Sequence, residues 1–263
     1  MESNIFTSDS YDTNENTPRF FWDKVLLNSR WVFVFKYMML VLKSRRIALK
    51  GLYDRQAWSN TSIVFFRIIE GCGGRFHLRG LDNIRNSKGS VVFVSNHMST
   101  LETMVFPGII APMREVTFVV KESLVKHPLF GPVMKARNPI LVTRKNLRED
   151  LEVVMRKGQE FLSGGTSIVI FPQSTRKVEF VPEEFNTLGV KLAAKAGVAV
   201  VPVAIKTDFL ENGKLLKELG PLSRNKPIYI TFGEPINIDI PIKEVHQKVI
   251  DFISGNLKKW GNE

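Results

Sequence analysis

Cysteine is almost absent from this sequence, and its scarcity excludes two classes of site. Cys72 is the only cysteine in 263 residues, so the chain has neither an internal disulfide nor a cysteine-rich metal centre. A single thiol fits a reducing, cytosolic setting. The histidines at His77, His127 and His246 are widely spaced and follow no metal-ligand pattern. We therefore expect no metal site.

The first 18 residues lack both basic side chains and a secretory signal. They are polar and carry four acids, Glu2, Asp9, Asp12 and Glu15, whereas a signal peptide begins with positive charge and continues into an apolar run. We interpret residues 1–18 as a disordered acidic tail. Because the whole chain has a formal net charge of +11 and these residues carry four acids and no base, residues 19–263 carry +15. Such a charge favours anionic partners: lipid headgroups, phosphorylated substrates, acidic carrier proteins or nucleic acid.

An uncharged apolar run of membrane-spanning length is also missing. Residues 25–42 are long enough to cross a bilayer, but they contain Arg30 and Lys36. A cation near the centre of a spanning helix costs roughly 2.5–3.5 kcal/mol. This cost favours a helix that lies in the membrane interface, with its apolar face among acyl chains and its cations among headgroups.

Lysines at a regular spacing support the interfacial interpretation. Lys36, Lys43 and Lys50 recur every seven residues, which places them on one polar stripe of a helix. Residues 58–69 are predicted to form the return helix of a hairpin, which ends at a Cys-Gly-Gly turn. We therefore predict an interfacial two-helix element over residues 19–72. The alternatives are a spanning helix and a face that packs on the protein's own core.

From residue 73 onward, β-rich runs alternate with helical patterns. The helical patterns are clearest over residues 147–162 and 183–196. The β-rich runs cover residues 76–78, 91–95, 116–120, 140–143, 167–171, 198–205 and 228–232. This alternation predicts a single α/β domain over residues 73–263, with a central mixed β-sheet flanked by helices. Ligands of such sheets bind beyond the carboxyl ends of the strands.

A histidine and a carboxylate follow the predicted strand over residues 91–95. Four residues separate His97 from Glu102 at a strand-to-helix turn, a spacing that can bring the two side chains together. A neutral imidazole can take a proton from an alcohol that attacks a carbonyl. A carboxylate on its other nitrogen fixes the tautomer and stabilises the cation that forms. Such a pair alone is more often structural than catalytic, so its neighbours decide the interpretation.

Cations follow three other predicted strands. Lys121, Arg144 and Arg176 each stand at or just beyond a strand end, and Arg176 closes the segment Phe-Pro-Gln-Ser-Thr-Arg. Backbone N–H groups, hydroxyl groups and a guanidinium can together hold a phosphate. With His97 at a fourth strand end, the three cations predict one anion-binding rim.

Four blocks in this order resemble those of the glycerolipid acyltransferase family, and in particular its bacterial 1-acylglycerol-3-phosphate acyltransferases of the PlsC type. The blocks are Asn-His followed by an acid, Lys-Glu-Ser-Leu with Pro128 and Gly131 nearby, Phe-Pro-x-x-Thr-Arg, and Val-Pro-Val-Ala-Ile. The resemblance covers roughly residues 75–235, and two helices ahead of the core match as well.

The resemblance implies an acyltransferase that moves a fatty acyl chain from an acyl thioester to a hydroxyl of a phosphate-bearing glycerolipid precursor. The implied acceptor is 1-acylglycerol-3-phosphate, the product is phosphatidic acid, and the thioester is on coenzyme A or acyl carrier protein. No metal or redox cofactor is implied. The protein would act at the cytoplasmic face of an anionic phospholipid membrane, as a peripheral or monotopic protein.

The resemblance also assigns roles to individual residues. It makes His97 the general base and Glu102 its partner. It makes the substrate-phosphate ligands Lys121, Arg144 and Arg176, and the other substrate contacts Asn96, Gln173, Ser174 and Thr175. Three positions depart from the family pattern, which has Asp where this chain has Glu102 and Glu-Gly where it has Gln173-Ser174.

Rival functions fit parts of the sequence. A serine hydrolase of the common type needs a Gly-x-Ser-x-Gly elbow, which this sequence lacks. A nucleic-acid-binding protein would stack bases on the N-terminal aromatic side chains, but the continuous apolar face there suits lipid better. A non-catalytic, membrane-binding member of the family fits the altered Phe-Pro block. Another lysophospholipid or hydroxylated lipid is the alternative acceptor.

Overall fold

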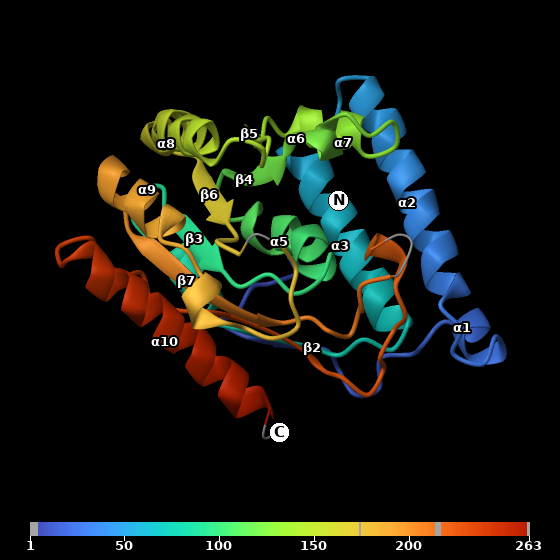
Figure 1. Ribbon diagram of the computed structural model, residues 1–263. Coiled ribbons are helices and arrows are strands. Elements are labelled where there is room, and N and C mark those ends of the chain that lie inside the picture. Colours follow the sequence, from blue (N-terminus) through green and yellow to red (C-terminus); the bar gives the residue numbers. More distant parts are fainter. Residues whose placement is uncertain (1–4, 174, 214–216, 262–263) are drawn as a thin grey trace.

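The predicted β-rich runs pair into one mixed sheet. The computed structural model describes residues 5–173, 175–213 and 217–261. Within them, eight strands lie in the order β1-β2-β8-β7-β3-β6-β4-β5 (Figure 1). Strands β7, β3, β6, β4 and β5 are parallel, and the pairs β1–β2 and β7–β8 are antiparallel. The strands are β1 (Tyr11–Asp12), β2 (Phe76–Arg79), β3 (Val92–Ser95), β4 (Val116–Lys121), β5 (Ile140–Val142), β6 (Ser167–Ile170), β7 (Val200–Lys206) and β8 (Ile228–Phe232).

Helices cover both faces of this sheet, as the alternating pattern predicts. Helices α8, α9 and α10 pack on one face, and α3 and α5 pack on the other (Figure 1). The helices are α1 (Phe21–Val25), α2 (Trp31–Leu49), α3 (Arg55–Gly71), α4 (Leu81–Arg85), α5 (Leu101–Ile110), α6 (Glu122–Val125), α7 (Gly131–Ala136), α8 (Leu147–Ser163), α9 (Leu188–Ala196) and α10 (Ile242–Gly261), with short 3-10 turns η1 (Pro182–Glu184) and η2 (Lys217–Leu219).

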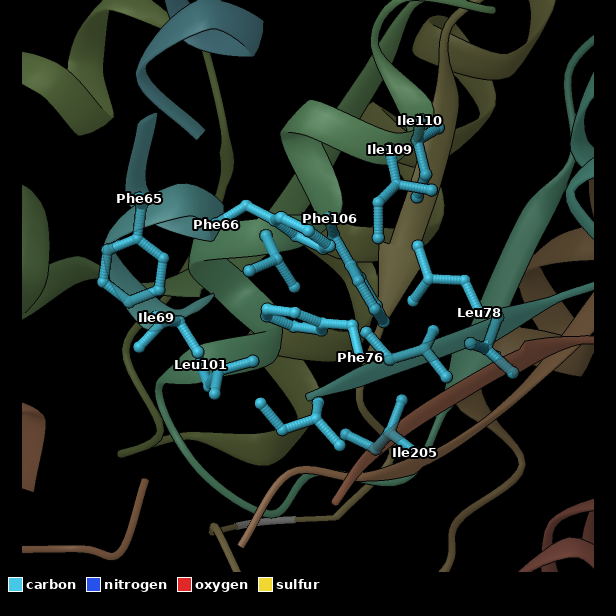
Figure 2. Close-up of a cluster of buried hydrophobic side chains, with 14 of the residues drawn as sticks. Phe65, Phe66, Ile69, Phe76, Leu78, Leu101, Phe106, Ile109, Ile110 and Ile205 are labelled. Carbon is cyan, nitrogen blue, oxygen red and sulfur yellow. The ribbon is translucent and has the colours of Figure 1, made fainter. Parts of the chain in front are cut away.

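The core is divided between the two faces of the sheet. In β3, Phe93 points into the cluster beneath α3 and α5, whereas Val92 and Val94 belong to the cluster beneath α8, α9 and α10. A strand buried on both faces appears in the sequence as a continuous apolar run. Figure 2 shows the first cluster, in which the rings of Phe66 and Phe76 stack with their centroids 3.8 Å apart.

Helix α3 belongs to this core. Asp54 caps its first turn by accepting a hydrogen bond from the Ala57 N–H. The Ser62 hydroxyl donates to the Met104 carbonyl and accepts from the Gly108 N–H, which locks α3 against α5. The sequence correctly predicts this helix, but its predicted place in the membrane interface is wrong. It is a core helix, and of the predicted pair only α2 exposes an apolar face.

The predicted helix over residues 25–42 is interrupted. Helix α1 ends at Val25, and the chain turns through Leu27 and Asn28, whose φ angles are +50° and +63°. Both are in the left-handed region, which bulky residues rarely adopt. Helix α2 then begins at Trp31. Among the residues described, no helix is both long and apolar enough to cross a membrane.

The N-terminal segment is ordered from residue 5 onward, so the predicted disorder of residues 1–18 is wrong for its described part. Strand β1 pairs with the edge strand β2. Phe6 is buried, and its ring meets those of Tyr11 and Phe66 edge to face at 5.4 Å. Asp12 accepts from Arg79 and contacts His77. A few apolar side chains and a paired acid therefore fix a segment whose average composition suggested disorder.

The predicted helix over residues 183–196 begins later than its pattern indicates. Residues Pro182–Glu184 form the short turn η1, and Phe185 is extended and buried beneath α9. The Asn186 side chain then accepts a hydrogen bond from the Leu188 N–H and starts the helix. Burial of one aromatic ring thus overrides the helical spacing of the residues before Leu188.

Candidate active site

Asn96 fixes the end of β3 to β7. Its amide nitrogen donates to the Ile205 carbonyl at 2.9 Å, and its amide oxygen accepts from the Ile205 N–H at 2.9 Å. The side chain is buried, and both ends of the amide are engaged by backbone. The predicted contact between Asn96 and substrate is therefore wrong. The residue instead anchors the turn that carries His97.

His97 and Glu102 meet across this turn, as their spacing predicts. The His97 Nδ1 atom lies 2.8 Å from Glu102 Oε1. The same oxygen accepts hydrogen bonds from the Met98 and Ser99 N–H groups, because Glu102 lies in the first turn of α5 and faces the start of the turn that carries His97. A carboxylate on Nδ1 keeps the proton on that atom and leaves Nε2 as the proton acceptor. The His97 side chain is 14% exposed and that of Glu102 is fully buried.

The second oxygen of Glu102 is held by two hydroxyl groups. Thr207 Oγ1, just beyond the end of β7, donates to Oε2 at 2.7 Å, and Ser99 Oγ donates at 3.0 Å. Burial raises the pKa of Glu102, but hydrogen bonds from His97 and Thr207, and the positive charge of His97, outweigh burial and lower the pKa below its ordinary value. The carboxylate is therefore anionic at neutral pH and suited to orient an imidazole.

The segment after β6 lies against the His97 turn. The Phe171 ring stacks on the His97 imidazole with a centroid separation of 4.3 Å. The Gln173 side-chain oxygen accepts from the His97 N–H at 2.7 Å, and the Lys177 N–H donates to the His97 carbonyl at 2.9 Å. Two clusters that are more than 70 residues apart in sequence thus form one site. The Gln173 amide nitrogen is buried without a hydrogen-bond partner among the described residues.

Arg176 stands on the same segment and reaches back to the start of α5. One end of its guanidinium donates to the Thr100 hydroxyl. The other end forms an ion pair with Glu218 at 3.1 Å. Arg176, the predicted phosphate ligand, therefore lies beside the His97 turn and is already paired with a carboxylate.

The other two predicted phosphate ligands follow neighbouring strands. Lys121 ends β4 and is exposed, and Arg144 follows β5. Because β3, β6, β4 and β5 are adjacent and parallel, their carboxyl ends share one edge of the sheet, which also carries His97. Arg144 has a φ of +59°, and Asp150 stabilises this turn by accepting from the Arg144 N–H at 2.7 Å.

Two further predicted contacts directly precede Arg176 in the sequence. Thr175 is exposed, and Ser174 lies outside the described residues. Within the described ranges, no cluster of three His, Cys, Asp or Glu side chains is placed to hold a metal ion.

Comparison with known proteins identifies the family. Residues 75–206 match the family described as Acyltransferase, which is half of the chain and contains the whole His97 turn and the Phe171–Arg176 segment. The chain belongs to the acyltransferase family. Its strand-end histidine and carboxylate thus occur within the region that defines this family.

Curated relatives of this acyltransferase carry one common name. The 1-acyl-sn-glycerol-3-phosphate acyltransferase of Pseudomonas aeruginosa is 32% identical over 149 residues, which cover 57% of this chain and 55% of that protein. The enzyme of that name from Escherichia coli is 26% identical over 142 residues, which cover 51% of this chain and 57% of that protein. The chain thus spans about half the length of the curated relatives it matches.

A solved structure shares the fold. The chain is similar to a crystal structure titled as the 1-acyl-sn-glycerophosphate (LPA) acyltransferase PlsC from Thermotoga maritima, with a TM-score of 0.67 and 19% sequence identity. The superposition covers 91% of this chain and 96% of that one. It extends well beyond residues 75–206, so the N-terminal helices and the C-terminal part belong to the shared architecture.

Several residues of the acyltransferase site are absent from the sequence-based prediction. Thr207 just follows a predicted strand, so the rule that selected Lys121 and Arg144 also applies to it. Phe171 was predicted only as the end of a strand. Glu218 has no signal in the sequence, because the fold alone brings it to Arg176 across 42 positions.

Proposed function

We propose that this acyltransferase transfers a fatty acyl chain to the free hydroxyl of 1-acylglycerol-3-phosphate and forms phosphatidic acid. The observation that carries the proposal is the contact between His97 Nδ1 and the buried Glu102 carboxylate, on a turn whose Thr100 hydroxyl accepts a hydrogen bond from the Arg176 guanidinium. One group can take a proton from a hydroxyl, and the other can hold a phosphate. The names of the curated relatives support the same acceptor.

The reaction requires one proton to move twice. His97 Nε2 takes the proton of the acceptor hydroxyl while its oxygen attacks the thioester carbon. The resulting imidazolium is stabilised by the Glu102 carboxylate on Nδ1. When the carbon–sulfur bond breaks, the proton on Nε2 passes to the leaving thiolate, and the ester and free thiol are released. Coenzyme A and acyl carrier protein are both candidate donors, and no metal or redox cofactor takes part.

Arg176 is the principal ligand proposed for the acceptor's phosphate. Its guanidinium reaches Thr100, on the turn that joins His97 to Glu102, so a phosphate bound there stands close to the general base. Lys121 and Arg144 lie at the same edge of the sheet and are proposed to supply further positive charge. Gln173 supports this arrangement indirectly, because it binds the His97 N–H.

An exposed apolar surface supports a peripheral or monotopic position on the cytoplasmic face of an anionic membrane. In α2, Trp31, Phe35, Met39 and Leu42 follow at helical spacing and are exposed. Lys36 and Lys43 lie beside this stripe, where cations meet headgroups. We call the whole region the α1–α2 surface, and it comprises Phe21, Trp22, Val25, Leu26, Leu27, Trp31, Phe35, Met39, Leu42 and Leu49.

An acyl-transfer assay of the purified protein tests the proposal. The acceptors are 1-acylglycerol-3-phosphate, glycerol 3-phosphate, a zwitterionic lysophospholipid and a monoacylglycerol, each with acyl-CoA and with acyl carrier protein thioester. We expect the first acceptor to give the highest kcat/KM. His97→Ala should lower kcat by at least about 100-fold, the scale of general-base catalysis, while circular dichroism shows that the variant keeps its fold.

Two results would contradict the proposal. Transfer to no acceptor would favour a non-catalytic, membrane-binding member of the family. A higher kcat/KM with the zwitterionic lysophospholipid would favour the alternative acceptor. This acceptor is tested because Gln173-Ser174 replaces the family's Glu-Gly in the segment proposed to contact substrate. His127→Ala is the matched control, because it removes an exposed histidine beyond the end of α6.

A further inference from the structure

The guanidinium proposed to bind phosphate already holds a carboxylate. Arg176 Nη2 lies 3.1 Å from Glu218 Oε1, and the Arg176 and Glu218 side chains are 19% and 26% exposed. A carboxylate and a phosphate oxygen use the same guanidinium donors. An acceptor phosphate and Glu218 therefore compete for one end of Arg176.

We propose that Glu218 occupies the position on Arg176 that the acceptor's phosphate takes, and that this residue thereby sets the affinity for phosphate-bearing acceptors. The inference rests on the proposed function. The Glu218 carboxylate competes with the acceptor: it pairs with the Arg176 guanidinium until a phosphate displaces it. An acceptor without a phosphate does not have to break the ion pair.

Contacts of the residue that follows Glu218 hold it near Arg176. The Arg30 guanidinium donates to the carbonyl of the next residue, Leu219, at 2.9 Å, and Leu219 packs against the large core cluster. Burial raises the pKa of Tyr37, the negative charge of Glu218 adds to this and the positive charge of Arg176 opposes it. The charges of this ion pair therefore lie near the Tyr37 side chain of α2.

The size of the effect follows from competition. When a binding group is free for only part of the time, the apparent dissociation constant is the intrinsic constant divided by the free fraction. A part-exposed ion pair of this kind is worth no more than about a factor of ten. Removal of the carboxylate should therefore strengthen acceptor binding by roughly threefold to tenfold.

A positioning role for Glu218 predicts the opposite change in acceptor affinity when the carboxylate is removed. If the carboxylate aimed Arg176 at the phosphate, its removal would weaken acceptor binding. The structure favours competition for two reasons. The Thr100 hydroxyl already orients the guanidinium from its other end, and Glu218 takes an end that a phosphate in the site would use.

Glu218→Gln is the direct test, because it keeps the size of the side chain and removes its charge. With saturating acyl-CoA, we expect the KM for 1-acylglycerol-3-phosphate to fall threefold to tenfold while kcat stays within twofold. Glu184→Gln is the matched control. It removes the same charge from the neighbouring ion pair with Lys177 and should leave KM unchanged. An unchanged or raised KM in Glu218→Gln would overturn the inference.

Binding of inorganic phosphate gives a measurement that is independent of catalysis. The phosphate concentration that raises Tm by a fixed amount should be threefold to tenfold lower in Glu218→Gln than in the unaltered protein. Arg176→Ala should remove this difference. Equal concentrations in the two proteins would overturn the inference, whether or not acyl transfer is observed. Tighter phosphate binding without any acyl transfer would instead count against the proposed function alone.

Discussion

At the scale of single residues, the site accommodates a longer acid than the family pattern has. The additional methylene of Glu102 carries its carboxylate deep enough to meet Thr207 as well as His97. Five donor groups converge on the two oxygens: the His97 ring, two backbone N–H groups and two hydroxyls. A buried carboxylate is stable only when its lone pairs are satisfied in this way. We therefore regard Thr207 as a positioning residue for the His97–Glu102 pair.

Thr207→Val tests this role through the pH dependence of stability. The pKa of Glu102 is lowered in the folded protein, so its contribution to stability is present above the ordinary pKa of a glutamate and is lost as pH falls through the folded value. Loss of the Thr207 donor raises the folded pKa, so this contribution should shrink. We expect a loss of roughly 1–3 kcal/mol at pH 7, and a smaller further loss on acidification than in the unaltered protein.

Urea titrations from pH 7 to well below the ordinary glutamate pKa measure both effects. Thr207→Ser keeps the hydroxyl and should follow the unaltered protein. Activity gives a second readout, because a loosened carboxylate should lower kcat and leave the acceptor KM unchanged. If Thr207→Val and Thr207→Ser lost equal stability and kept full kcat, the hydroxyl would have no positioning role.

The residue-scale prediction succeeded where sequence neighbours also meet in space. His97 and Glu102 are five positions apart, and one strand-to-helix turn suffices to join them. Thr207 and Glu218 reach the site only because β7 lies beside β3 and η2 returns to Arg176. No local pattern encodes such contacts. Asn96 was misassigned for a related reason, since its partner Ile205 is on the neighbouring strand.

At the scale of elements, hydrophobic pattern predicted the sheet well and the N-terminal segments poorly. The central strands β3, β6 and β7 are buried on both faces, and their continuous apolar runs are visible in the sequence. The exposed face of α2 is equally apolar, so the pattern could not distinguish it from α3, which packs against α5. The acidic tail was misjudged because a few contacts, those of Phe6 above all, decide whether it is ordered.

Phe6→Ala tests whether the N-terminal segment is part of the folded domain. The ring is buried between Tyr11 and Phe66, and deletion of a buried phenyl ring costs roughly 3–5 kcal/mol. We expect a loss of this size in the free energy of unfolding, measured by urea denaturation. Thr7→Ala changes the exposed neighbour and should be neutral. A neutral Phe6→Ala would restore the interpretation of a disordered tail.

At the scale of the whole molecule, apolar side chains and positive charge together favour an anionic membrane. The chain carries a formal net charge of +11, and this charge attracts the protein over about one Debye length, roughly 10 Å at 0.1 M salt. The apolar side chains of the α1–α2 surface act only at contact. Salt should therefore weaken the electrostatic attraction and leave the apolar contact unchanged. The two contributions to membrane binding can then be measured separately.

A double substitution in α2 separates these terms. Trp31 and Phe35 are 63% and 69% exposed, and burial of such side chains is worth roughly 1.5–3 kcal/mol each. Replacement of both by Ser should weaken cosedimentation with anionic vesicles by more than about tenfold, while the slope of binding against salt concentration is retained. Leu147→Ser is the control, because Leu147 is 81% exposed on α8, which covers the opposite face of the sheet from α3 (Figure 1). Equal losses in the control and the double variant would place membrane contact elsewhere on the molecule.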